Sequence, residues 1–211
     1  MKRRSLDLVK TAKQALAAGN LARAEALCTR ALERSPHDRE ALGVAGALAT
    51  AREEWELALG HLDAMLAQDD KDAWAHLARA RALLGLGRLD EARAALHRSR
   101  DLDPADPGLY EIEATILRGQ GELDAALHAC EGAVALDPHR VSAYAMRADL
   151  LDAMGRGDEA LEVLRTAVRK LGRSAESHVA LLEKLAALLD ARGEPEEAAA
   201  ARSLVSQLRG R

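Results

Sequence analysis

Aromatic side chains are scarce in this sequence. The 211 residues include no phenylalanine, two tryptophans and two tyrosines, so aromatic residues make up 2% of the chain. A protein that binds single-stranded nucleic acid stacks bases on aromatic rings and follows the phosphates with a basic surface. The net charge here is −4, and the basic segment Lys2–Arg4 is short. We therefore expect no nucleic-acid partner.

The residue patterns that carry chemistry are also missing. The sequence has no HExxH or CxxC spacing, no GxGxxG, and no glycine-rich loop followed by lysine and serine or threonine. Metal and phosphate sites need such closely spaced ligands or glycines. The seven histidines are scattered along the chain. We expect no catalytic residue, no cofactor and no metal, and a protein that is not an enzyme.

Long apolar stretches are absent as well. The longest uncharged apolar run, Ala41–Ala51, is about half the roughly 20 residues that a membrane-spanning helix needs. The N-terminal segment carries Asp7, Lys10 and Lys13, so it lacks the apolar core of a secretory signal. These features predict a cytoplasmic protein with no membrane insertion. The bias toward alanine, arginine and leucine favours a bacterial source of high GC content.

The sequence is instead rich in small residues that recur with a fixed period. Alanines recur every 34 residues, and once after 38, at Ala24, Ala58, Ala92, Ala126, Ala160 and Ala198. Five residues before each stands a turn residue, namely Gly19, Glu53, Gly87, Gly121, Gly155 and Gly193. Seven residues before each turn stands a small side chain: Ala12, Gly46, Ala80, Ala114, Ala148 and Ala186. Periods of 20 to 50 residues are typical of repeat architectures.

This pattern resembles the tetratricopeptide repeat, a 34-residue unit of two helices joined by a tight turn. With Ser5 as repeat position 1, the segment Tyr110–Pro138 shows the pattern most fully: an aromatic residue at position 4, small residues at 8, 20 and 27, glycine at 15 and proline at 32. The resemblance implies an all-α, right-handed solenoid of about twelve helices over residues 5–208. The repeats are expected at 5–38, 39–72, 73–106, 107–140, 141–174 and 179–208, between a tip at 1–4 and a tail at 209–211.

Two departures from the pattern concern the expected boundaries. Between Leu66 and Trp74 the loop reads as two residues shorter than the pattern and lacks proline, which leaves the register of the first helix of repeat 3 open. Four extra residues fall near 170–178, either as a lengthened helix or as a small loop.

The two cysteines occupy equivalent places in this scheme. Cys28 and Cys130 both stand at position 24 of a second helix, three repeats apart. With helices stacked about 9 Å apart, their separation far exceeds the roughly 4.4 to 6.8 Å between Cα atoms in a disulfide. We expect two buried apolar thiols, which fits a reducing compartment.

In the family that this chain resembles, positions 2, 5, 6, 9, 12 and 13 of the first helices line a concave groove. Carried onto this sequence, the groove is predicted to contain Val44, Ala47, Trp74, Leu77, Arg81, Ile112, Thr115, Arg118, Met146 and Asp149. An apolar floor with a few charges suits an extended peptide or an amphipathic helix. The alternative for Trp74 and Leu77 is a place in the core. If Ile112 lines the groove, the Ile112→Glu variant should fold and lose its partner.

The resemblance implies a non-catalytic adaptor or scaffold that docks a protein or peptide partner in this groove. The clamp that such repeats use for chaperone C-termini needs lysine, arginine and asparagine, and the corresponding residues here include only one basic side chain, Lys13. Two alternatives stay open: a chaperone for secreted or assembled subunits, and a scaffold that self-assembles through the solenoid ends. At position 24 the last repeat has Arg202 in place of an apolar residue, which predicts a capping repeat. The rival interpretation is an exposed stripe of Leu204, Val205 and Leu208 that contacts another subunit.

Overall fold

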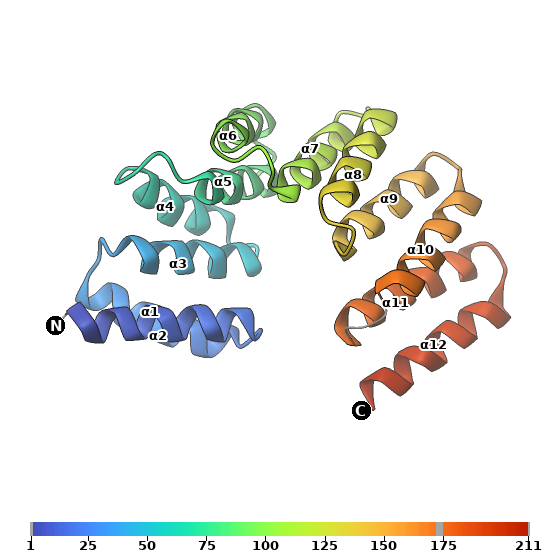
Figure 1. Cartoon of the computed structure of the whole chain (residues 1–211), viewed down its shortest axis with the longest axis horizontal. Coiled ribbons are helices and arrows are strands. Elements are labelled where there is room, and N and C mark those ends of the chain that lie inside the picture. Colours follow the sequence, from blue (N-terminus) through green and yellow to red (C-terminus); the bar gives the residue numbers. More distant parts are fainter. Residues whose placement is uncertain (1, 172–174, 211) are drawn as a thin grey trace. The chain divides into compact units, whose positions relative to one another are not determined.

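The computed structural model describes residues 2–171 and 175–210, and the side chains of residues 7–171 and 179–210. Within these ranges the chain forms twelve α-helices and no strand (Figure 1). The helices are α1 (Lys2–Ala17), α2 (Leu21–Arg34), α3 (Arg39–Ala51), α4 (Trp55–Leu66), α5 (Ala73–Gly85), α6 (Leu89–Leu102), α7 (Pro107–Gly119), α8 (Leu123–Leu136), α9 (Val141–Ala153), α10 (Gly157–Leu171), α11 (Ala175–Ala191) and α12 (Pro195–Arg209). The all-α prediction is confirmed.

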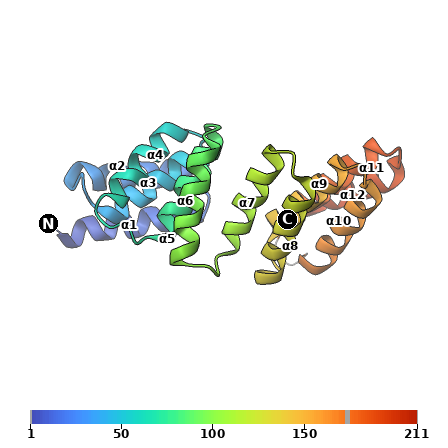
Figure 2. The ribbon, with the colours of Figure 1, turned by 90° about the horizontal axis from the view of Figure 1, so that it is seen from above.

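The chain divides into two compact units, and each consists of three helical hairpins. Unit 1 comprises Met1–Ala105 and unit 2 comprises Asp106–Arg211. In each unit the first and second helices of a repeat pack side by side (Figures 1 and 2). Neighbouring first helices also contact one another, α1 with α3 and α3 with α5 in unit 1, and α7 with α9 and α9 with α11 in unit 2. One continuous solenoid over 5–208 stays a prediction.

The turn inside each hairpin is set by a single left-handed residue. The residue at position 15 has a positive φ in all six repeats, at 61° for Glu53 and between 71° and 80° for the five glycines. The amide of this residue and the next amide close the helix end, as in unit 2, where Gly121 N donates to Arg118 O at 3.1 Å and Glu122 N donates to Leu117 O at 2.9 Å. Glycine adopts this conformation without a Cβ clash. Repeat 2 adopts it with a glutamate.

The small residues of the repeat are the contact points of the hairpins. All six alanines at position 20 are fully buried, at 0% exposure, and the alanines at position 8 are at 2% or less. At position 8 of repeat 2, a Cβ added to Gly46 would lie 3.0 Å from Leu62, closer than ordinary van der Waals contact. A larger side chain at these positions would force the paired helices apart.

The first helix of repeat 3 is in register with the others, which resolves the question that the sequence left open. Helix α5 begins at Ala73, 34 residues after the start of α3 and 34 before the start of α7. Its N-cap Asp72 accepts a hydrogen bond from a first-turn amide, as do Asp38 and Asp106 for α3 and α7. The preceding loop is longer than in the neighbouring repeats, and the prediction of a shorter loop was wrong. Helix α4 ends at Leu66 after 12 residues, whereas α2, α6 and α8 have 14.

In the last repeat, position 24 is occupied by an exposed polar residue. The Arg202 guanidinium is exposed and binds Asp190 with two hydrogen bonds to Oδ2 and one to Oδ1, between 2.7 and 3.1 Å. Of the rival stripe, Val205 is 6% exposed and packs into the core, whereas Leu204 is 47% exposed. The predicted insertion lies partly outside the described residues, at 172–174, and its last four residues, 175–178, begin helix α11.

Both cysteines lie in the core as free thiols. Cys28 Sγ donates a hydrogen bond to the Ala41 carbonyl oxygen at 3.2 Å. Burial raises the pKa of both the Cys28 and the Cys130 thiol to about 11. Since the thiolate is the reactive form, these groups are inert at neutral pH, in agreement with a structural role.

Candidate peptide-binding surface

A hollow of about 400 Å³ lies on the first helices of unit 1, and we call it the first-helix hollow. Its walls come from α1, α3 and α5, with one residue from α4. It is lined by Lys13, Leu16, Arg39, Glu40, Gly43, Val44, Ala47, Met65, Asp72 and Trp74. Three residues of the predicted groove, Val44, Ala47 and Trp74, therefore meet in one place.

The hollow depends on a glycine in α3. A Cβ added to Gly43 would lie 3.5 Å from Cζ3 of Trp74 and 3.3 Å from Sδ of Met65. The Trp74 ring therefore lies against the bare backbone of α3. It remains 45% exposed, and with Leu57, Leu136 and Leu204 it is among the large apolar side chains in the described part of the chain that face solvent. The core alternative for Trp74 is wrong.

Two ion pairs flank the apolar floor of the first-helix hollow. Lys13 Nζ lies 3.1 Å from Glu40 Oε2. Arg39 Nη2 lies 2.5 Å from Asp72 Oδ2 and 3.6 Å from Asp69 Oδ2. Lys13 and Arg39 thus face the carboxylates of Glu40 and Asp72, which line the hollow. The Asp69 carboxylate is not part of the lining. A surface with paired charges and an exposed indole favours apolar contacts over recognition of a charged group.

The first helices of unit 2 have a different surface. Glu111 of α7 is 7% exposed, and its carboxylate accepts two hydrogen bonds from Arg140, from Nε at 2.8 Å and from Nη2 at 2.9 Å. Ser142 Oγ donates to the same carboxylate. The hydrogen bonds to Glu111 raise the pKa of Arg140. This polar cluster around the buried Glu111 carboxylate ties the start of α9 to α7.

The ten predicted groove residues divide by exposure. Val44, Leu77 and Ile112 are buried, at 3%, 7% and 4% exposure. Ala47, Thr115 and Met146 are partly buried, and Arg81, Arg118 and Asp149 are exposed like Trp74. Leu77 and Ile112 belong to the core side of their helices, so the expectation that Ile112→Glu leaves folding intact conflicts with the structure. Asp149 forms an ion pair with Lys184 of α11.

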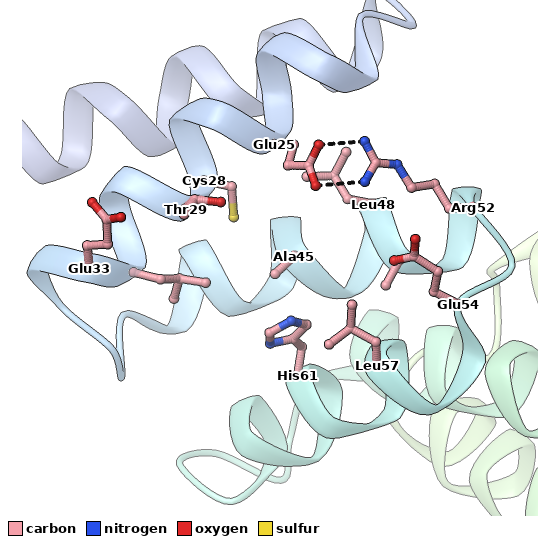
Figure 3. Close-up of a pocket in the computed structure, with 12 residues that line it drawn as sticks. Glu25, Cys28, Thr29, Glu33, Ala45, Leu48, Arg52, Glu54, Leu57 and His61 are labelled. Atoms are coloured by element: carbon pink, nitrogen blue, oxygen red, sulfur yellow. Dashed lines mark hydrogen bonds and ion pairs between the residues drawn. The ribbon is translucent and has the colours of Figure 1, made fainter.

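A second hollow lies on the other side of unit 1, and the repeat pattern did not predict it. It has a volume of about 290 Å³ and lies between α2 and α4 above α3, and we call it the second-helix hollow (Figure 3). It is lined by Glu25, Cys28, Thr29, Leu32, Glu33, Ala45, Leu48, Ala49, Arg52, Glu54, Leu57 and His61. No Cα atom of α2 lies within 8 Å of one in α4, which leaves space between the two helices.

At one end of this hollow an ion pair joins α2 to the end of α3 (Figure 3). Arg52 Nη1 and Nη2 donate to the two carboxylate oxygens of Glu25, each at 2.7 Å. This pairing lowers the pKa of the Glu25 carboxyl. On α4, burial lowers the pKa of His61. The imidazole is therefore neutral at neutral pH.

The described residues hold no cluster of three or more histidine, cysteine, aspartate or glutamate side chains that could bind a metal ion. Nor does any helix in that part of the chain have the length and apolar character needed to cross a membrane.

Comparison with known structures places the fold among tetratricopeptide repeat proteins. A tetratricopeptide repeat protein of Thermus thermophilus is 22% identical, with a TM-score of 0.76 over 86% of this chain and 98% of that chain. One from Parabacteroides merdae is 19% identical, with a TM-score of 0.78 over 97% of this chain and 78% of that chain. YrrB, a repeat protein described as having an unusual peptide-binding site, is 20% identical, with a TM-score of 0.53 over 81% of this chain and 88% of that chain. These likenesses confirm the α-solenoid fold.

Family models extend the same result to the sequence. No curated protein matches the chain. Models described as tetratricopeptide repeat match residues 9–73, 49–116 and 117–185. Together these segments cover most of the 211 residues and include both units. The chain belongs to the tetratricopeptide repeat family.

Proposed function

We propose that this protein is a non-catalytic interaction module that binds a segment of a partner protein in the first-helix hollow of unit 1. Binding of protein partners is the general role of the family. YrrB, which shares the fold, is described as having a peptide-binding site. In this chain we assign the corresponding role to the residues around Trp74.

The observation that carries the proposal is the exposed indole of Trp74 above the glycine surface of α3. Tryptophan is enriched among the residues that dominate binding energy at protein interfaces. Its position beside Val44 and Ala47 offers a pocket for an apolar side chain, and the flanking ion pairs supply polar groups at the rim. An extended peptide or an amphipathic helix with apolar anchors fits this surface.

The test is affinity capture of the tagged protein from a lysate of its source organism, comparing wild type with Trp74→Ala. Leu204→Ala is the matched control, since Leu204 is exposed to a similar extent, at 47% against 45%. Partners that are present with wild type and Leu204→Ala but lost with Trp74→Ala support the proposal. Partners retained by Trp74→Ala contradict it.

Folding of the Trp74→Ala variant must be checked alongside. The side chain is nearly half exposed, so we expect the far-UV circular dichroism spectrum to be unchanged. Each captured partner should then be divided into short overlapping peptides and tested for binding, since the proposal requires a short segment to suffice. Binding that needs a whole folded partner domain would argue against a groove-docked segment.

A further inference from the structure

The geometry points to the second-helix hollow of unit 1 as a separate docking site for a short basic, amphipathic segment of a partner protein. An aliphatic side chain of that segment enters the hollow beside Leu57, and lysine or arginine side chains face Glu33 and Glu54. This site lies on a different face of unit 1 from the first-helix hollow and does not rest on the proposed function.

An exposed leucine marks the site. Leu57 lines the hollow and is 52% exposed. It stands at repeat position 19, where repeats 1, 3, 4 and 5 have Arg23, Glu91, Ala125 and Glu159. In Figure 3 its side chain and that of His61 point from α4 toward Ala45 on α3. Leu48 and the buried Cys28 complete an apolar floor.

The floor of the hollow is apolar because the junction of repeats 1 and 2 has short uncharged side chains where two other repeat junctions have an ion pair. Between repeats 2 and 3, Arg79 at position 7 pairs with Asp63 at position 25, with Nε 2.7 Å from Oδ1. Between repeats 4 and 5, Arg147 pairs with Glu131 at the same two positions, at 3.1 Å.

Between repeats 1 and 2, the same two positions hold Ala45 and Thr29. No long side chain crosses the groove there, and both residues line the hollow. Two short side chains thus stand where the junctions of repeats 2 and 3 and of repeats 4 and 5 have an ion pair across the groove.

The matching groove of unit 2 shows what this difference does to the chemistry of the surface. A hollow of about 290 Å³ lies over α9 as well, so the two have the same size. Arg147 stands in its floor, and its other lining residues are Tyr144, Leu151, Glu159, Glu162, Val163 and Thr166. In unit 1 the floor is apolar, so an aliphatic side chain can be buried there without leaving a guanidinium desolvated.

The charge around the second-helix hollow selects the partner. Of its three carboxylates, only Glu25 is paired, through the two hydrogen bonds from Arg52. Glu33 and Glu54 form no ion pair with any residue in the described part of the chain. His61 adds no compensating charge at neutral pH, because burial lowers its pKa. Two negative charges beside an apolar floor favour a segment that is basic and aliphatic.

The size of the hollow limits the segment to a short one. Helix α2 advances about 12 Å from Glu25 to Glu33, at roughly 1.5 Å per residue. A volume of about 290 Å³ is at the small end of the roughly 300 to 1,000 Å³ of small-molecule pockets. Two helical turns with one inserted leucine or isoleucine match these dimensions.

The experiment is selection of a displayed library of random 12-residue peptides on the full chain, with the Thr29→Asp/Ala45→Arg double variant for counter-selection. This variant introduces the Asp63–Arg79 type of ion pair between repeats 1 and 2 and should fold, because that pair is accommodated between repeats 2 and 3. Peptides retained only by wild type should carry an aliphatic residue flanked by lysine or arginine. No enriched peptide, or an acidic consensus, would overturn the proposal.

Anisotropy of one labelled, enriched peptide then measures the effect of single changes. We expect Leu57→Ser to weaken binding by roughly tenfold or more, as for loss of an interface anchor. Glu33→Gln with Glu54→Gln should weaken it and reduce its dependence on salt. Leu57 is half exposed, so its variant should remain folded even if the double variant does not.

Trp74→Ala is the control that separates the two sites, because it alters the first-helix hollow alone. It should leave binding of this peptide unchanged. Peptides that bind Leu57→Ser as tightly as wild type, or that are lost with Trp74→Ala, would contradict a second site.

Discussion

The first helices of the two units differ at the same pair of repeat positions. In unit 1, Gly43 at position 5 of repeat 2 lies under Trp74 at position 2 of repeat 3. In unit 2, Glu111 at position 5 of repeat 4 accepts a hydrogen bond from Ser142 at position 2 of repeat 5. The first pair makes an exposed apolar surface, and the second is part of a polar cluster around the buried Glu111 carboxylate.

The two units share the residues that determine the geometry of each hairpin, but they differ in residues at the contact between neighbouring repeats. The turn at position 15 and the alanine at position 20 have the same conformation and burial in both units. They determine how two helices pair. Positions 2 and 5 lie where one repeat meets the next, and there the side chains decide whether the surface is open or closed.

The largest effect is expected from Ile112→Glu in unit 2. Ile112 is 4% exposed, so the variant places a carboxylate in an apolar environment, and we expect a loss of at least roughly 3 kcal/mol in the free energy of unfolding. Ala47→Glu in unit 1, on a partly exposed residue that lines the first-helix hollow, should cost less than about 1 kcal/mol. Urea denaturation followed by circular dichroism measures both. Equal losses would contradict the difference in burial between Ile112 and Ala47.

Removing the charge of Glu111 should have the next largest effect. Glu111→Gln leaves Arg140 without its carboxylate partner, and since the Arg140 side chain is 27% exposed and can reach water, we expect a loss of roughly 1 to 2 kcal/mol. The matched control is Glu40→Gln, because its ion pair with Lys13 is about half exposed on both sides. The control should change the urea midpoint very little. A similar shift in both variants would show that the Glu111–Arg140 pair contributes no more to stability than the exposed Lys13–Glu40 pair.

The smallest effect, and a gain, is expected at the turn of repeat 2. Glu53 has a φ of 61° in a turn where the other repeats have glycine. Glu53→Gly should raise the free energy of unfolding by about 1 kcal/mol, since it removes left-handed strain at a non-glycine residue. The reverse change in unit 2, Gly121→Ala, should lower it by a similar amount. Thermal unfolding measures the pair, and a loss with Glu53→Gly would indicate a stabilising role for the glutamate side chain.

The backbone of this fold could be predicted from sequence because its constraints recur. Gly19 and its equivalents, and Ala24 and its equivalents, mark steric requirements that the chain meets six times. The register of repeat 3 was harder to predict because Trp74 stands two residues before position 4, the site of the repeat's aromatic residue. Its ring lies instead on Gly43 of the neighbouring helix.

The surface was only partly predictable. Leu77 and Ile112 were assigned to the groove from positions of the family pattern, but a first helix packs on several sides, and these two positions face its core contacts. The second-helix hollow was missed because its apolar floor depends on which residues face each other between repeats. Two features of the sequence could have indicated it. Ala45 and Thr29 stand where the Arg79–Asp63 type of pair occurs in other repeats, and Leu57 stands at repeat position 19.

We propose that unit 1, and not unit 2, holds a partner segment on its first helices. Hydrogen exchange of the full chain, with and without a peptide captured through the Trp74-dependent interaction, tests it most directly. Docking should slow exchange in α3 and α5 and leave α7 and α9 unchanged. Protection of α7 and α9, with none in α3 and α5, would contradict the account.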